Sequence, residues 1–306
     1  MDVIFIIAFL ILLGYFLKSC GLLAEKDKAA LNNIVLYMAL PALIFVSMLR
    51  NVHAAELGSY LKLTFFILLI CVFCTIVSYF IGKALKLQPK SLAAFVLVCA
   101  CGNTALIGFP VIAGFYGNDG FTRAIFCDAA TLMVLIVLAT YLSAKVGGQK
   151  VNIFRQILKF PPTIAWFLSL ILILCGIDLS YFPAIAVTIL DMVGAVVVPL
   201  IMFSLGISLS HKYLKIALIP AIFVTAVHSL FAPAAGLFLT HVFQFSELDK
   251  KVAVLQAGMP PAMTSAVLSE LYDFDTKLVS AAIFLATGFA LVSIPIWHIL
   301  LEAGWV

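Results

Sequence analysis

Two stretches decide the fold of this chain: Cys101-Gly-Asn-Thr-Ala-Leu-Ile-Gly-Phe-Pro110 and Met259-Pro-Pro-Ala-Met-Thr-Ser-Ala-Val-Leu268. Each places glycine or proline next to Asn, Thr or Ser inside a long apolar run. Glycine weakens a helix, and proline removes an amide donor and clashes with the preceding turn. Backbone groups freed at the centre of a bilayer are tolerated only where protein or water surrounds them. The two stretches therefore predict two interrupted membrane helices, over Leu92–Phe115 and Val252–Leu271.

The composition around these stretches is that of an integral membrane protein. The chain has 306 residues, of which 65% are hydrophobic and 10% charged, and its mean hydropathy is +1.22. A soluble domain usually carries about 25% charged residues, so lipid must be the solvent for most of this chain. We expect an all-α fold, because backbone groups that face lipid must be satisfied within their own segment.

Apolar runs and their polar breaks give ten segments, and a membrane helix takes roughly 20 residues. They are Val3–Leu17, Leu31–Met48, Tyr60–Ile81, Leu92–Phe115, Thr122–Ala144, Ile157–Cys175, Phe182–Ile207, Ile216–Phe243, Val252–Leu271 and Leu278–Leu301. The first run begins almost at once and lacks the positive segment of a signal peptide, so we expect it to be the first membrane helix.

The basic residues predict the orientation, because cytoplasmic loops carry an excess of Lys and Arg. One set of loops holds Lys18, Lys26, Lys28, Lys83, Lys86, Lys90, Lys145, Lys150, Arg155, Lys159, Lys212, Lys215 and Lys277. The opposite set holds only Arg50, Lys62, Arg123, Lys250 and Lys251. The first set should be cytoplasmic, which predicts a multi-pass protein of the cell membrane with both termini extracytoplasmic.

The two halves of the chain are related in sequence. A polar break around Lys145–Lys150 predicts a first repeat at 1–146, a cytoplasmic linker at 147–151 and a second repeat at 152–306. Pro41-Ala-Leu-Ile-Phe45 matches Pro199-Leu-Ile-Met-Phe203, 158 positions later, and the two opening stretches match at the same offset. The turns after them, Phe115–Asp119 and Leu271–Asp275, match two positions out of step. Five helices per half make the second half enter the membrane upside down, which predicts an inverted repeat, a common transporter plan.

Interruptions at matching positions of two halves point to a transporter binding site. Each interruption creates the N-terminus of a half-helix, where free N–H groups and the dipole favour a negative charge. Asn103 offers a donor and an acceptor, and the hydroxyls of the stretches can cap a helix or bind a ligand. We therefore predict a substrate site for a small carboxylate formed by Asn103, Thr104, Pro260, Pro261, Thr264 and Ser265. It needs no buried Arg, and no apolar run has one near its middle.

The two stretches could instead be ordinary helix kinks, since Pro and Gly are frequent in membrane helices. That interpretation suits the remaining prolines in the apolar runs, which are Pro41, Pro199, Pro220, Pro233 and Pro295. The two opening stretches differ from these because they are central, paired between the halves and accompanied by polar groups.

Ionisable residues inside the membrane are candidates for function. Asp128 and Glu270 are our coupling candidates, and Asp191 and His228 are also embedded in apolar runs. A buried carboxylate at Asp128 could exchange a proton during transport, or it could instead form a hydrogen bond to a neighbouring helix.

Other classes of function lack their signatures. The seven cysteines lie mostly inside apolar runs, which predicts small buried hydrophobes and no metal site. The net charge of +4 is small, so we expect no nucleic-acid partner. Catalytic and nucleotide-binding motifs such as H-E-x-x-H, G-x-S-x-G, the P-loop and G-x-G-x-x-G are missing. We therefore expect a protein that is not an enzyme and has no cofactor beyond a coupling ion, H⁺ or Na⁺.

Four stretches resemble the auxin efflux carrier family in its short prokaryotic form, over essentially the whole chain. They are Tyr37-Met-Ala-Leu-Pro-Ala-Leu-Ile-Phe45, Gly102-Asn-Thr-Ala-Leu-Ile-Gly-Phe-Pro110, Pro199-Leu-Ile-Met-Phe-Ser-Leu-Gly206 and Met259-Pro-Pro-Ala-Met-Thr-Ser265. The resemblance implies a fold like that of bile acid–sodium symporters and sodium–proton antiporters. In it, helices 1, 2, 6 and 7 form a scaffold, and helices 3–5 and 8–10 form a moving transport domain in which helices 4 and 9 cross.

The resemblance also implies elevator-type alternating access, a homodimer and roles for particular residues. Asn103 matches the family's substrate-contacting asparagine, and Pro260 or Pro261 matches the second crossover proline. The chain departs from the plant carriers in having Gly102, not proline, before the asparagine, and in lacking their long central loop. These departures put auxin itself in doubt, and prokaryotic relatives imply dicarboxylates such as malate or malonate, or another organic acid.

The sequence thus predicts a membrane-embedded secondary transporter for a small organic anion, working by uniport or proton coupling. A sodium-coupled symporter or cation/proton antiporter is a rival prediction, because unwound carbonyls can hold Na⁺. A passive channel and a membrane sensor on a carrier fold also stay open.

Overall fold

A computed structural model describes residues 2–24, 27–146, 160–208, 213–214 and 216–304. Helices make up the regular structure of these residues, and the extended pairing found among them is a single bridge between Gly102 and Pro261. The expected all-helical class is therefore confirmed. The predicted linker 147–151 lies outside the described residues.

The chain forms two compact units. The first comprises Met1–Leu61, Phe109–Ile125 and Phe154–Leu209, and the second comprises Lys62–Gly108, Phe126–Ile153 and Ser210–Val306. The first unit therefore holds the predicted helices 1, 2, 6 and 7, and the second holds helices 3, 8, 9 and 10 with parts of 4 and 5. Residues 109–125 belong to the first unit. The scaffold and transport roles that the resemblance implies for these sets of helices stay a prediction.

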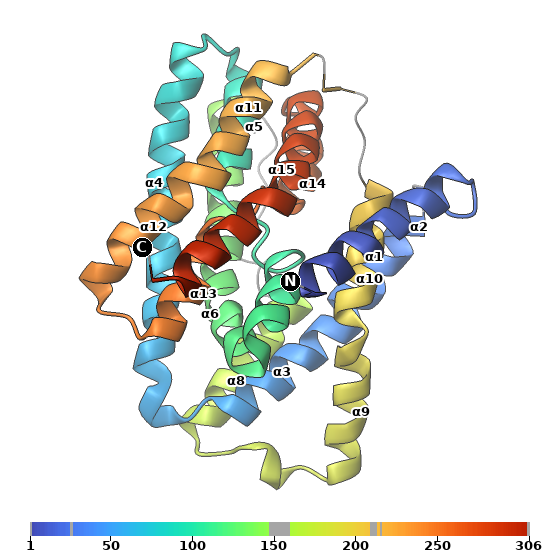
Figure 1. The fold of residues 1–306 in the computed structure, drawn as a ribbon, viewed down its shortest axis with the longest axis vertical. Helices are drawn as coiled ribbons and strands as arrows, with labels where there is room; N and C mark the ends of the chain where they lie inside the picture. The colour runs from blue at the N-terminus through green and yellow to red at the C-terminus, as the bar shows by residue number, and fades with distance from the viewer. Residues whose placement is uncertain (1, 25–26, 147–159, 209–212, 215, 305–306) are drawn as a thin grey trace. The chain divides into compact units, whose positions relative to one another are not determined.

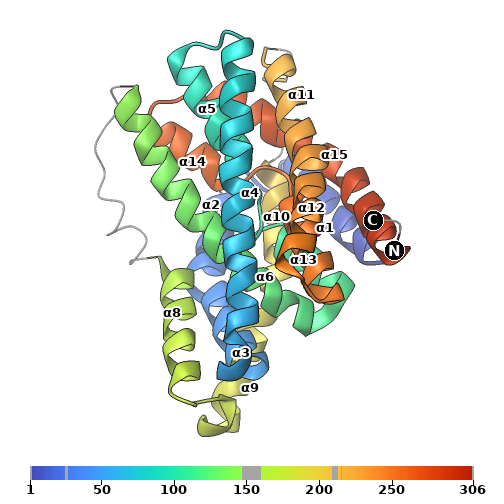
Figure 2. The ribbon, with the colours of Figure 1, turned by 90° about the vertical axis from the view of Figure 1, so that its left-hand side faces the viewer.

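The helices of the first unit are α1 (Asp2–Ser19), α2 (Asp27–Ile34), the π-turn η1 (Val35–Ala39), α3 (Leu40–Asn51), the short η2 (Ala54–Glu56), α8 (Pro161–Leu174), η3 (Leu179–Tyr181), α9 (Ala184–Ala195) and α10 (Val197–Ser208). Within this unit α1 packs against α10 (Figure 1), and α3 packs against α8 and α9 (Figure 2).

Two glycines allow α1 and α10 to approach closely. A Cβ atom at Gly14 would lie 2.5 Å from the carbonyl oxygen of Phe203, and one at Gly206 would overlap the backbone of Ile11. Small residues let helix backbones meet in membranes, where packing rather than the hydrophobic effect drives association. Close packing of the two helices therefore explains why glycine occupies position 206, at the end of the third family motif.

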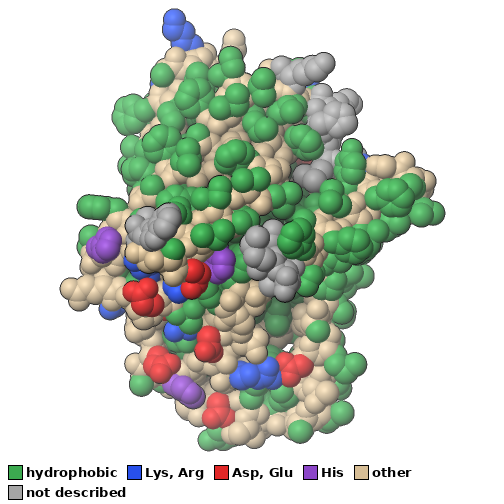
Figure 3. Space-filling view, in the orientation of Figure 1, with side chains coloured by type: hydrophobic (Ala, Val, Ile, Leu, Met, Phe, Trp, Pro, Cys, Tyr) green, Lys and Arg blue, Asp and Glu red, His purple; other side chains and the backbone are tan. Residues whose placement is uncertain are grey.

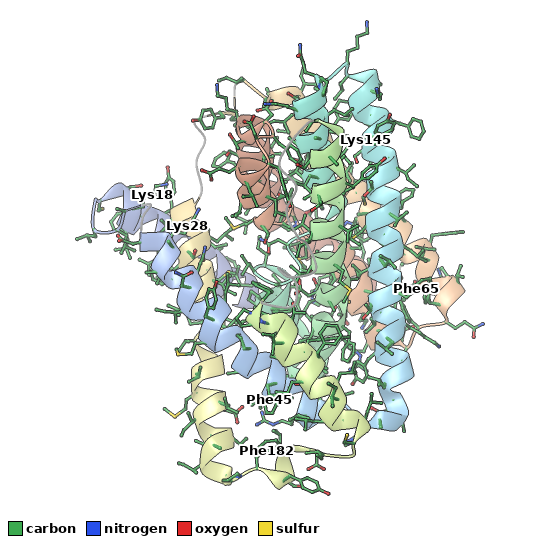
Figure 4. All side chains as sticks on the ribbon, turned by 180° about the vertical axis from the view of Figure 1, so that it is seen from behind. Lys18, Lys28, Phe45, Phe65, Lys145 and Phe182 are labelled. Atoms are coloured by element: carbon green, nitrogen blue, oxygen red, sulfur yellow. The ribbon has the colours of Figure 1, made fainter. Side chains whose placement is uncertain are left out.

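Polar and aromatic pairs hold the ends of the first unit. Phe45 of α3 and Phe182 pack edge to face with ring centroids 5.6 Å apart (Figure 4). Lys18 and Lys28 lie near the α1–α2 connection in the same view. Asp191 of α9 accepts a hydrogen bond from Arg50 at 2.7 Å, and both side chains are about two-fifths exposed. Asp191 therefore has a structural partner at the surface.

The helices of the second unit are most of α4 (Leu57–Ala84), α5 (Pro89–Ala100), the later part of α6 (Gly108–Lys145), α11 (Leu218–Ala226), the π-turn η4 (Val227–Phe231), α12 (Ala232–Phe243), α13 (Glu247–Ala257), α14 (Thr264–Leu271) and α15 (Thr276–Glu302). Here α15 packs against α11, α5 and α14, and α12 packs against α13. The surface of α11 and α12 is crowded with apolar side chains such as Ile219, Ile222 and Phe238 (Figure 3).

Six helical stretches are long and apolar enough to cross a membrane. They are Asp27–Asn51, Ala54–Ala84, Gly108–Lys145, Ala184–Ile207, Leu218–Phe243 and Thr276–Glu302. Shorter apolar helices occur at Phe5–Ser19, Pro89–Ala100 and Pro161–Leu174. The six stretches support a membrane protein, and the count of ten spans stays a prediction.

The boundary between the predicted runs Leu92–Phe115 and Thr122–Ala144 is a kink within the predicted turn Phe115–Asp119. The structure joins their adjacent parts in α6, within which Gly117 leaves the helical region with φ 61° and ψ −153°. Glycine adopts a positive φ without steric cost, so the single residue Gly117 makes the turn between the two helical parts.

Candidate functional site

Two non-helical segments of the second unit meet where the sequence predicted the interruptions. Segment 101–107 separates α5 from α6, and segment 258–263 separates α13 from α14. They run antiparallel and pair at Gly102 and Pro261. We call these two segments together the crossing.

Backbone hydrogen bonds on both sides of the bridge hold the crossing together. The Asn103 N–H donates to the carbonyl of Pro260 at 2.6 Å, and the Ala262 N–H donates to the carbonyl of Cys101 at 3.0 Å. Because proline has no N–H, Pro260 and Pro261 can only accept, and the neighbouring residues supply the donors. Backbone groups of the two segments thus form hydrogen bonds with each other, although the segments lie far apart in the sequence.

Gly102 lets the two backbones come this close. A Cβ atom there would lie 3.0 Å from the carbonyl oxygen of Met259 and 3.4 Å from its Cβ. Glycine is the usual residue where one backbone approaches another closely. The contact gives a local reason for Gly102 in this position.

Asn103 closes the first turn that leads into α6. Its Oδ1 accepts a hydrogen bond from the Leu106 N–H at 3.0 Å, and its carbonyl accepts one from the Gly108 N–H at 2.9 Å. The side chain therefore closes a local turn ahead of α6, whose N-cap residue is Ile107. Its Nδ2 is buried and has no hydrogen-bond partner among the described residues, and the side chain is 4% exposed. The crossing therefore contains a buried amide donor that is available to a ligand or a water molecule.

Thr104 connects the crossing to the ionisable residue that the sequence singled out. Its hydroxyl donates to Oδ1 of Asp128 at 2.6 Å, and the threonine is buried. Asp128 lies in α6, 24 residues further along the chain, so the fold brings the two predicted residues together.

Gln256 of α13 belongs to the same site, although the sequence analysis did not select it. Its Nε2 donates to the carbonyl of Thr104 at 3.3 Å, and its Oε1 is buried without a partner among the described residues. The side chain fills the space beside Gly108, where an added Cβ would collide with it. The sequence signal that could have identified it is its polar side chain inside an apolar run, two positions before Gly258.

The second segment is arranged differently. The Ser265 hydroxyl is buried and donates to the carbonyl of Ala262 at 2.5 Å, whereas Thr264, the first residue of α14, is exposed. Glu270 is exposed near the end of α14, about 9 Å along the helix from Thr264 at 1.5 Å per residue. Asn103, Thr104, Pro260 and Pro261 thus lie in the crossing, and Asp128 and Ser265 form hydrogen bonds to it. Thr264 and Glu270 are exposed on α14.

The thiols near the crossing lie in apolar surroundings. Cys101 Sγ lies 3.9 Å from Cys71 Sγ of α4 and 3.7 Å from the carbonyl of Thr131. Within the part of the chain that the structure describes, no group of three or more His, Cys, Asp or Glu side chains could hold a metal ion.

An all-helical chain with several membrane-length helices and two paired non-helical segments is a polytopic membrane protein. Residues 1–298 match the family described as "Membrane transport protein". The chain therefore belongs to this transporter family, the auxin efflux carrier family that its four motifs indicate, and that sequence prediction is confirmed.

Relatives cover the chain almost completely. An uncharacterized transporter of Methanocaldococcus jannaschii is 38% identical over 308 residues, which cover 100% of this chain and 98% of the relative. The uncharacterized transporter YfdV of Escherichia coli is 24% identical over 94% of this chain and 93% of its own length. A probable auxin efflux carrier component 9 of Oryza sativa is 29% identical over 153 residues, 48% of this chain and 35% of the plant protein.

Proposed function

We propose that this chain is a secondary transporter that moves a small organic anion across the cell membrane by elevator-type alternating access. In this proposal the chain crosses the membrane ten times as two inverted repeats of five helices. Leu92–Phe115 and Val252–Leu271 are then broken helices that cross at Gly102 and Pro261. The family and the pairing of one segment from each half support this arrangement.

The observation that carries the proposal is the buried Nδ2 of Asn103. A buried donor without a partner costs about 1–3 kcal/mol, so a ligand or water is expected to accept from it. A carboxylate oxygen is a strong acceptor for such a donor. The N-termini of α6 and α14 follow the two segments, and their dipoles favour the same charge.

Asp128 supports coupling to a cation. A carboxylate at Asp128 would repel an anion bound beside Thr104, and a proton or Na⁺ on Asp128 would remove that repulsion. We propose proton coupling, or uniport with Asp128 protonated throughout. Sodium coupling is the rival outcome, and Glu270 is a weaker candidate because it lies apart from the crossing.

The elevator mechanism is supported by the place of the site within the fold. Both segments of the crossing, together with Asp128 and Gln256, belong to the second unit. A site built inside one compact unit can move with that unit against a scaffold without being dismantled.

A thermal-shift screen of the purified protein against a panel of mono- and dicarboxylates tests this proposal. A ligand at about 100 times its dissociation constant should stabilise the wild type by about 2.7 kcal/mol. Asn103→Ala and the isosteric Asn103→Asp should abolish the shift, because the first removes the donor and the second replaces it with an acceptor. Asn118→Ala, at an exposed position, is the matched control and should keep the shift.

The outcomes distinguish the competing functions. If no carboxylate stabilises a well-folded sample, or if Asn103→Asp responds like the wild type, the organic-anion site is wrong. In proteoliposomes, saturation and counterflow distinguish a carrier from a channel. Replacing Na⁺ with choline distinguishes sodium from proton coupling, and a folded protein that binds without transporting supports a sensor.

The proposal extends to assembly and orientation. We expect a homodimer in lipid, which mass photometry in nanodiscs would measure. We also expect both termini to be extracytoplasmic, so terminal epitope tags should be accessible to antibody on intact cells.

A further inference from the structure

The connection between α11 and α12 contains a π-turn, Val227–Phe231, closed by a hydrogen bond from the Ala232 N–H to the carbonyl of Val227. Pro233 follows it and lacks the N–H that would normally reach the carbonyl of Ser229, four residues earlier. The indole Nε1 of Trp297 in α15 donates to that carbonyl at 2.8 Å. Proline thus accounts for the irregular turn, and tryptophan satisfies the carbonyl that it frees.

The π-turn aims one side chain at the crossing. His228 is 2% exposed, and its Nε2 lies 3.0 Å from the carbonyl oxygen of Val98, in the last turn of α5. The last four carbonyls of a helix have no partner within it, and the residue four positions after Val98 is Gly102, which pairs in the crossing. His228 therefore satisfies a carbonyl that the interruption of α5 sets free.

The contact also determines which ring nitrogen of His228 carries a hydrogen. A carbonyl can only accept, so Nε2 must carry the hydrogen. The backbone of Met259, in the second segment of the crossing, is a second hydrogen-bonding neighbour of the ring. Any form of the ring that carries a hydrogen on Nε2 matches the contact with Val98.

We propose that His228 is a positioning residue that fixes the end of α5 and thereby the place of Asn103, five residues beyond Val98. The role rests on the proposed function of the crossing as the substrate site. It is carried by the Nε2–H donor and not by the charge of the ring. π-Turns often occur at functional sites. Here the turn places the His228 side chain against a carbonyl at the C-terminal end of α5.

Hydrogen–deuterium exchange of the purified protein in lipid nanodiscs tests this role without any substrate. The variants are His228→Gln, whose amide nitrogen can occupy the place of Nε2, and His228→Phe, which has no donor. His241→Phe, at an exposed position on α12, is the matched control. The readout is exchange in peptides that cover residues 101–108, compared with peptides from α1.

We expect His228→Phe to speed exchange in residues 101–108 by about fivefold or more, because losing a buried partner costs about 1–3 kcal/mol and 1.4 kcal/mol is tenfold. His228→Gln should stay near the wild type, and His241→Phe should change nothing there. Unchanged exchange in His228→Phe, or equal acceleration in His228→Gln, would overturn the proposal.

Nitrogen-15 NMR of the wild type with labelled histidine provides a second test, which remains decisive if His228→Phe fails to fold. The resonances missing in His228→Gln should show a ring with hydrogen on Nε2. A ring with hydrogen on Nδ1 alone would contradict the assigned role. Because neither test uses a carboxylate, failure of the substrate screen and failure of the positioning role are separate results.

Discussion

Replacing Gly102 with alanine should destabilise the crossing by steric overlap alone. The added methyl group would lie 3.0 Å from the carbonyl oxygen of Met259, where an ordinary contact begins at 3.4 Å. The two backbones must therefore separate by about 0.4 Å. That separation acts on two hydrogen bonds that flank the bridge, Asn103 N–H to Pro260 and Ala262 N–H to Cys101, which are 2.6 and 3.0 Å long.

The cost can be estimated from the two effects together. Overpacking in a close-packed region costs about 1–3 kcal/mol, and each weakened hydrogen bond contributes up to about 1 kcal/mol. We expect Gly102→Ala to lower the free energy of unfolding by about 1–3 kcal/mol and to lower Tm by several degrees. Thermal unfolding of the protein in a defined detergent measures this change.

Gly288→Ala is the matched control for the same chemical change. Gly288 lies in α15 of the same unit, and a Cβ there meets nothing within 4 Å. Alanine in a helix interior is favoured over glycine by about 0.5–1 kcal/mol, so this variant should be as stable as the wild type or more so. If Gly102→Ala is equally stable, the close approach at the crossing does not exist in the form described.

Three further predictions concern other contacts. Asp128→Ala should cost about 1–3 kcal/mol of stability, because the buried Thr104 hydroxyl loses its acceptor; Asp128→Asn keeps an acceptor and should cost less, and equal losses by thermal unfolding would contradict this. Gly206→Ala should cost about 1–3 kcal/mol by forcing α10 away from α1, so a wild-type Tm would rule out that packing. Arg50→Met should change stability by less than about 1 kcal/mol, because its pair with Asp191 is two-fifths exposed; a coupling above about 2 kcal/mol in a double-mutant cycle with Asp191→Asn would refute this.

The elements that could be predicted are those that depend on local chemistry. Pro260, Pro261 and Gly102 weaken a helix wherever they occur, so the positions of the non-helical segments followed from the residues themselves. The turn expected at Phe115–Asp119 contains the observed kink, which a single glycine with positive φ makes at Gly117. Composition alone does not distinguish a tight turn from a short loop.

By itself, the sequence determined the membrane class, the family motifs and the candidate role of Asn103, because hydropathy and helix breaking are properties of short segments. Only the tertiary structure decided which side chains complete the site. Thr104 meets Asp128 across 24 residues, His228 meets Val98 across 130 and Gln256 meets Thr104 across 152. Hydrogen bonds act over about 3 Å and in a fixed direction, so partners this distant in sequence become known only when the fold brings them together.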